Sequence, residues 1–209
     1  VTFIIATNRK EDKAHVSGIL EPVKSRFDTI VELNTEPEDW ARWALKNDIR
    51  TEIVAYIRFQ PEMLHQFNAT LNLVNSPIPR TWAKLSGLLD LNPPEDIVFD
   101  MCEGAVGHEA AIAFYAFRKV YMQLPTVDQV LLNPKKAIVP DEPSAQWAIV
   151  TAVGRKTTVQ NVDQVHTYAK RLPKEFNVLL MKDSMENDPD ITSTRTFIDW
   201  GIENQEVLA

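Results

Sequence analysis

Three polar side chains occupy positions from which they could act on a phosphate group. Asn8 follows a short apolar run, and Arg26 lies in the connector to the next apolar run. Arg80 follows Pro79 at the predicted start of a helix. A guanidinium can bind two phosphate oxygens at once, and a side-chain amide can orient a water molecule. These residue types are therefore suited to binding an anionic ligand; the alternative is that Asn8 caps a strand end and both arginines are solvated surface charges.

Two segments are predicted to be strands that position the first two of these side chains. Phe3–Thr7 and Thr29–Leu33 are short, apolar and rich in β-branched or aromatic residues. Asn8 then lies at the C-terminal edge of the first strand, where open α/β sheets bind ligands. We expect the two segments to pair directly, to pair with another copy, or to lie irregularly against helices, because unpaired apolar edges invite new pairings.

The residues around these strands resemble the end of the AAA+ ATPase core, and most closely its MoxR-type branch. The first strand ends in Thr-Asn-Arg, the connector contains Leu20 and Pro22 before Ser-Arg-Phe, and a second strand follows. The resemblance implies that Asn8 is the sensor-1 residue, which orients the attacking water. It also implies that Arg26 is the arginine finger, which reaches the nucleotide of a neighbouring subunit and can contribute about 10³–10⁵ in rate.

A helical segment after the second strand resembles the AAA+ lid. Helices are predicted from about Thr35, with Thr35 and Glu38 as a capping box, and from Thr51 to the residue before Pro61. A further helix begins at Pro79, with Trp82, Leu85, Leu88 and Leu89 on its apolar face. In the AAA+ pattern the third main lid helix begins with the sensor-2 arginine, so the resemblance assigns that nucleotide-binding role to Arg80.

Two parts of an ATPase are missing from this sequence. It contains no G-x-x-x-x-G-K-[ST] loop to cradle phosphates, and no apolar strand ending in paired acidic residues to hold Mg²⁺. The chain also begins at Val1, directly on a predicted strand. We therefore expect a piece of a longer protein: ATP and Mg²⁺ belong to the parent protein, and no cofactor is expected on this fragment, which is inactive alone.

The predicted fold is mainly α. Residues 1–34 are expected to be the remnant of an α/β core, residues 35–91 the helical lid domain, and residues 92–209 an α-helical bundle extension. Within the extension, residues 110–124 are apolar nearly all round, which predicts a central buried helix. A short helix capped by Thr126 and helices over 144–156, 159–172, 174–186 and 193–206 are expected to follow, joined by short polar links.

Composition excludes several classes of function. A net charge of −7 argues against a nucleic-acid-binding surface, including a helix-turn-helix. The single cysteine, Cys102, excludes an internal disulfide, fits a reducing cytoplasmic location, and is predicted to be a buried inert thiol. No apolar run is long enough for a membrane span. The four histidines lack metal-ligand spacing, so no metal site is predicted.

Two functions remain open. The first is the C-terminal part of a MoxR-like AAA+ ATPase, a chaperone-like remodelling machine. The resemblance then implies self-association into a ring, often a hexamer, and a von Willebrand factor A-type partner. The second is a non-enzymatic α-helical protein-interaction module in which Asn8, Arg26 and Arg80 have no joint role.

Overall fold

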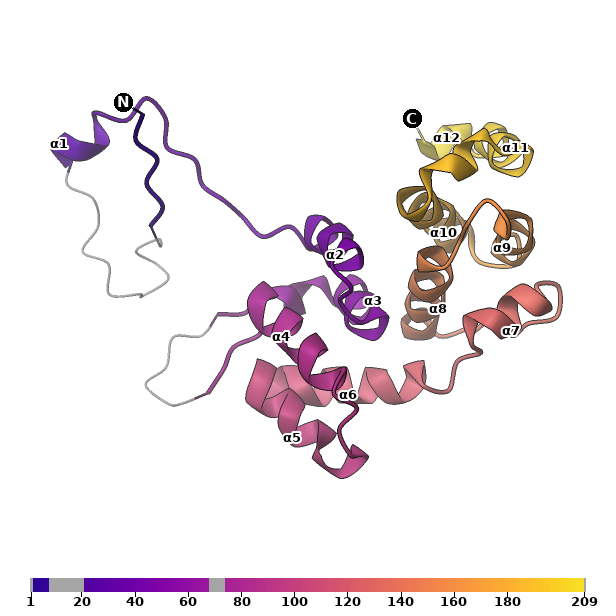
Figure 1. The fold of residues 1–209 in the computed structure, drawn as a ribbon, viewed down its shortest axis with the longest axis horizontal. Coiled ribbons are helices and arrows are strands. Elements are labelled where there is room, and N and C mark those ends of the chain that lie inside the picture. Colours follow the sequence, from indigo (N-terminus) through magenta and orange to yellow (C-terminus); the bar gives the residue numbers. More distant parts are fainter. Residues whose placement is uncertain (1, 8–20, 68–73, 209) are drawn as a thin grey trace.

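The computed structural model is mainly α-helical, which confirms the predicted fold class (Figure 1). It describes residues 2–7, 21–67 and 74–208. No helix in these ranges is both long and apolar enough to cross a membrane. The α-helices are α1 Glu21–Lys24, α2 Pro37–Lys46, α3 Thr51–Phe59, α4 Pro79–Leu89, α5 Glu95–Val106, α6 His108–Tyr121, α7 Val127–Leu132, α8 Pro143–Arg155, α9 Val162–Ala169, α10 Lys174–Asn187, α11 Arg195–Glu203 and α12 Gln205–Leu208, and the 3₁₀ helices are η2 Pro61–Leu64 and η3 Pro189–Ser193.

The first hydrophobic core is formed by α2 to α6. Helix α3 runs through its centre, and the side chains of Ile53, Val54 and Ile57 are fully buried there, as their helical spacing predicts. An aromatic cluster joins three of the helices: the Tyr56 ring lies 5.4 Å from both Trp82 of α4 and Phe114 of α6, centroid to centroid. Because α5 and α6 pack into this core, the lid-like helices and the start of the extension share one interior.

The second core is formed by the helices from α7 to α11. Its largest buried side chains include Ile149 of α8, Tyr168 of α9, Leu180 of α10 and Trp200 of α11. The predicted cap of α7 is confirmed: Thr126 accepts a hydrogen bond from the Gln129 backbone N–H, and the Gln129 side chain accepts one from Thr126. In Figure 1 this core extends from the pink α7 through the orange helices to the yellow α11.

Helix α8 joins the two cores. It packs against α10 in the second core and against α3 in the first, and its Ala148 belongs to the first cluster while Ile149 belongs to the second. The helical body therefore has two interiors with one shared wall. The predicted boundary at residue 91/92 stays a prediction. Leu124, between α6 and α7, packs against both apolar clusters.

The two predicted strands do not form. Residues 2–7 and 28–36 have irregular backbone, and no residue in the part of the chain described is in a strand. A strand needs a partner for its backbone N–H and C=O groups, and nothing in a single described copy supplies a sheet for these segments. Their apolar side chains are also exposed rather than packed on helices, with Ile4 at 94% and Leu33 at 86%. Figure 1 shows that the described residues before α2, 2–7 and 21–36, extend away from that helix; they are called the arm below.

Several local predictions also need correction. Helix α2 begins at Pro37 with Glu36 as its N-cap, and no side chain caps it. The predicted capping box does not form, because Glu38 is then the second helical residue rather than the third, and its side chain pairs with Arg58 of α3. Helix α5 was not predicted, although a proline followed by Glu95 and Asp96 is a helix-start signal. Helix α6 is not buried all round, since Ile112 is half exposed.

Candidate functional site

Arg80 lies in the first turn of α4, as predicted, and its side chain is exposed. Pro79 precedes it and has no backbone N–H. The N–H groups of Thr81 and Trp82 both donate to the carbonyl of Ile78, and the Ile78 N–H donates to Thr81 Oγ1 at 3.0 Å. Because these bonds occupy part of the helix terminus, the guanidinium itself is the main group that could bind an anion there.

Buried residues fix α4 directly behind Arg80. Trp82 is fully buried two residues later, and its indole N–H donates to the Met63 carbonyl at 2.9 Å. Leu85 and Leu89 are buried one and two turns further along. Leu88, predicted on the same apolar face, is partly exposed. Arg80 is therefore presented at the tip of a rigidly packed helix.

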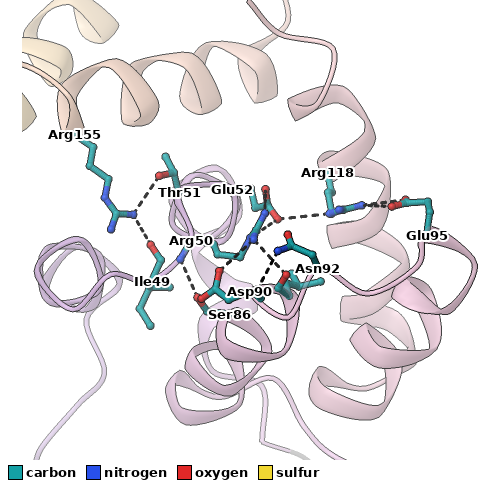
Figure 2. A network of polar contacts seen from close by, with 11 residues as sticks. Ile49, Arg50, Thr51, Glu52, Ser86, Asp90, Asn92, Glu95, Arg118 and Arg155 are labelled. Atoms are coloured by element: carbon teal, nitrogen blue, oxygen red, sulfur yellow. Dashed lines mark hydrogen bonds and ion pairs between the residues drawn. The ribbon is translucent and has the colours of Figure 1, made fainter. Parts of the chain in front are cut away.

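A polar network holds the opposite end of α4 (Figure 2). The Arg50 backbone N–H donates to Ser86 Oγ at 2.9 Å, and its guanidinium donates to the Leu89 carbonyl at 3.3 Å. The same guanidinium also pairs with Asp90 at 3.2 Å. Since these bonds tie α4 to the residue that precedes α3, the two helices are expected to move as one unit.

Glu52 lies at the centre of this network. Its side chain is 6% exposed, and its carboxylate lies 3.0 Å from Arg50 Nε and 3.5 Å from Arg118 Nε of α6. Arg118 also donates to both carboxylate oxygens of Glu95 on α5, at 3.0 Å each. Each buried charged side chain in the network lies beside a side chain of opposite charge, because an unpaired charge in the interior is energetically costly. Figure 2 shows that the network links α3, α4, α5 and α6, so its role is structural.

The structure does not bring together Arg26 and Arg80, two of the three predicted site residues. Arg26 is exposed in the turn after α1, on the arm, and Figure 1 shows α1 far from α4, so Arg26 and Arg80 do not meet within one copy. Asn8 lies outside the described residues, as does the geometry predicted between Asn8 and Arg80. No described residue forms an ion pair with Arg80. Arg80 is thus an unengaged cation on an ordered helix.

The described part of the chain contains no group of three or more His, Cys, Asp or Glu side chains placed to hold a metal ion. Cys102 is fully buried, as predicted, and burial raises the pKa of its thiol to about 11. Since the thiolate is the reactive form, this thiol is inert at neutral pH.

A second charged site, which sequence reasoning missed, joins the two cores. The Arg58 side chain of α3 is 1% exposed and forms a bidentate pair with Asp183 of α10, with Nη2 at 2.9 Å from Oδ1. Glu38 lies 3.3 Å from the same guanidinium. A cavity of about 240 Å³ adjoins Asp183, and Arg42, Lys46 and Arg155 also line it. No sequence signal connects residues 125 positions apart, so only the fold reveals this pair.

Comparison with protein-family models, with curated proteins and with solved structures finds no match. The interpretation therefore depends on the residues themselves.

Proposed function

We propose that this chain is the sensor and lid part of a MoxR-like AAA+ ATPase. The observation that supports this most directly is Arg80: an exposed arginine without an ion pair among the described residues, in the first turn of a well-packed helix that follows α2 and α3. A sensor-2 arginine needs this placement, because it must contact phosphates from a helix whose position depends on nucleotide state.

The proposed roles divide among three residues. Arg80 contacts the phosphates held in its own subunit, Arg26 reaches the nucleotide of the neighbouring subunit, and Asn8 orients the attacking water. ATP and Mg²⁺ are held by parts of the parent protein outside this sequence, which contains no phosphate-binding loop. In the proposal, Arg26 and Arg80 place positive charge where negative charge develops on the equatorial oxygens of the transferred phosphoryl group.

The packing of α4 explains how nucleotide state could move a large body. Arg50 ties the end of α4 to α3, and Glu52 and Arg118 continue the connection to α6. A displacement of Arg80 would therefore move α4 together with the other helices of the first core, because these contacts hold the helices together. In this proposal the lid rotates as a unit when the γ-phosphate is bound or lost.

The exposed arm is also consistent with an ATPase core. Phe3, Ile4, Ile5, Ile30, Val31 and Leu33 are each more than half exposed in the described chain. Contiguous exposed apolar side chains of this kind mark surfaces that another element covers. In the proposal that element is the parent protein's parallel sheet. Ring formation, chaperone-like remodelling, a von Willebrand factor A-type partner and a cytoplasmic location extend the same proposal.

The alternative is a non-enzymatic helical interaction module. One observation favours it: the helical body has two hydrophobic interiors of its own, and the arm that would carry Arg26 packs on neither. Under this alternative Arg80 is a surface charge, and changing it has no effect on nucleotide hydrolysis.

The test compares Arg80→Ala with Lys84→Ala in the full-length product of the gene that encodes this chain. Lys84 is exposed one turn further along α4 and provides a matched loss of charge. We expect Arg80→Ala to lower ATP turnover by about 10²-fold or more, the usual cost of one transition-state donor, and Lys84→Ala to leave it unchanged. Equal turnover in both variants, or no ATPase activity in the wild-type protein, would reject the proposal.

Arg26 is tested by mixing subunits. If Arg26 acts on a neighbour's nucleotide, Arg26→Ala subunits still bind ATP but should lower turnover by about 10³-fold or more. Adding them to the wild-type protein should then reduce activity more than dilution does, because each inserted subunit disables an adjacent site. Activity that falls only in proportion to dilution would place Arg26 outside the finger role.

A further inference from the structure

A groove lies on the second core, between the segment that follows α7 and one side of α9. Its volume is about 440 Å³. Leu132, Pro134, Lys135 and Lys136 form one wall, and Gln164 of α9 contributes to the other. The segment Leu132–Ile138, here called the basic loop, is followed by the long connection to α8. Neither the polar network nor the proposed nucleotide site involves this surface.

The backbone of the basic loop is fixed by side chains of α9 and the residues after it. Arg171 donates to the carbonyls of Pro134 and Ala137 at 2.8 and 2.7 Å. The hydroxyl of Tyr168, a fully buried residue, donates to the Ile138 carbonyl at 2.9 Å. The Asn133 carbonyl also accepts two backbone N–H groups of the loop. A loop already ordered in this way loses little conformational entropy on binding, which favours affinity.

The groove is locally positive on an acidic chain. Lys135 and Lys136 are exposed, and neither forms an ion pair in the described part of the chain. Arg171 adds a third cation beside them. The one carboxylate in the lining, Asp163, accepts a hydrogen bond from Thr196, so its charge is partly engaged. Since the whole chain carries −7, this surface is complementary to an acidic partner rather than typical of the molecule.

Apolar side chains accompany these cations. Leu132 is 79% exposed and Ile138 is 69% exposed, although both lie on the ordered loop. A partner that covered them would add hydrophobic burial to the charge attraction. The cations are too few for a nucleic-acid surface, which neutralises many phosphates, or for an anionic membrane, which is bound by about four to eight clustered lysines and arginines.

We infer that this groove is a docking site for a short acidic peptide segment of another protein, with a bulky apolar residue between aspartates or glutamates. The apolar residue packs against Leu132, and the carboxylates pair with Lys135 and Lys136. Asn133 and Gln164 offer amide groups to the peptide backbone. The inference goes beyond the proposed ATPase function and needs no nucleotide, so either can fail without the other.

The test measures fluorescence anisotropy of a labelled twelve-residue peptide of glutamates and leucines with the 209-residue chain. We expect saturable binding that weakens with added salt. The double variant Lys135→Glu/Lys136→Glu should weaken binding at least about tenfold. Lys156→Glu/Lys182→Glu changes net charge equally at exposed lysines outside the groove, and should alter binding less than about twofold. Circular dichroism verifies that each variant is folded.

A second variant separates docking from plain charge attraction. Leu132→Ser should weaken binding several-fold at every salt concentration, as should replacing the peptide's leucines with serines. The inference is overturned by absence of binding, or by equal loss in both double variants. It is also overturned if the serine peptide binds as well as the leucine peptide. Tighter binding of phosphatidylserine vesicles or of a thymidine oligonucleotide through the same lysines would overturn it in favour of those partners.

Discussion

Two arginines of the first core have opposite surroundings. Arg58, at the junction of the two cores, is 1% exposed and forms a bidentate pair with Asp183. Arg80, at the tip of α4, is exposed and has no ion-pair partner among the described residues. The same residue type therefore has two settings: the buried charge holds helices together, and the exposed one faces solvent.

The surroundings of the two arginines also differ in packing: helices approach closely beside Arg58, whereas Arg80 lies at an exposed helix end. At the junction, helices α8 and α10 approach so closely that a Cβ atom added at Gly154 would lie 2.7 Å from Asp183 Cβ. At the tip of α4, Trp82 is buried beneath the helix while Arg80 extends away from the core. Substitutions at the junction should therefore lower stability strongly, and substitutions of Arg80 at the tip should change stability little.

The largest effect is expected from Arg58→Ala. It leaves the Asp183 carboxylate buried without its partner, and such a loss typically costs about 3–5 kcal/mol of unfolding free energy. Urea denaturation of the 209-residue chain measures it. Arg42→Ala is the matched control, since Arg42 forms an exposed pair with Asp39 and its removal should cost about 1 kcal/mol or less.

A double variant tests whether the pair is a unit. If Arg58→Met and Asp183→Leu are combined, no buried charge is left without a partner, because Glu38, which also contacts Arg58, is more than half exposed. The double variant should therefore be more stable than either single variant. If the losses of unfolding free energy in the two single variants simply add in the double variant, the two side chains contribute independently. Arg58 and Arg80 would then differ in burial but not in the energetic importance of an ion pair.

Gly154→Ala is expected to have the next largest effect. The new methyl group would meet Asp183 Cβ, which cannot rotate away, so α8 and α10 must separate. Overpacking of this kind costs about 1–3 kcal/mol. Gly87→Ala is the control: nothing lies within 4 Å of its added Cβ on α4, and alanine favours a helix, so that variant should gain stability. Equal stability of the two alanine variants would show that the α8–α10 contact is looser than described.

The sequence predicts the helices better than it predicts how they combine. The fully buried positions Ile53, Val54 and Ile57 follow from helical periodicity, and the Thr126 cap follows from residue type. These are local properties, set by neighbours a few positions away. The Arg58–Asp183 pair is not local, and both residues look like ordinary surface charges when read along the chain.

The failed strand predictions have a related cause. Phe3–Thr7 and Thr29–Leu33 have strand-like composition, but composition specifies only a tendency that a sheet must complete. Arg80 was placed correctly because a proline followed by an apolar helical pattern fixes a helix start. Whether Asn8 and Arg26 share a site with Arg80 depends on long-range geometry, which motif spacing alone does not determine.

The burial of His166 is intermediate between that of Arg58 and that of Arg80. Its ring is partly buried, with Nε2 buried and unpartnered in the described structure. Burial lowers its pKa, and Lys170 lowers it further, while Glu203, Asp163 and Asp199 oppose the shift. The unfolded chain then binds more protons between the lowered pKa and about 6.5, so stability should fall as pH drops through that window. Comparing unfolding free energies of wild type and His166→Gln at pH 7.5 and 5.5 measures this contribution. An equal change with pH in both proteins would exclude His166.

The smallest effect on stability is expected at Arg80. A cation in the first turn of a helix faces the positive end of the helix dipole, which is unfavourable by about 0.3–1 kcal/mol. Arg80→Ala should therefore leave the unfolding free energy unchanged or slightly raised, and Arg80→Glu should raise it further. Thermal unfolding of the three proteins at low salt gives the order. A loss above about 1 kcal/mol in Arg80→Ala would instead make Arg80 a structural residue like Arg58.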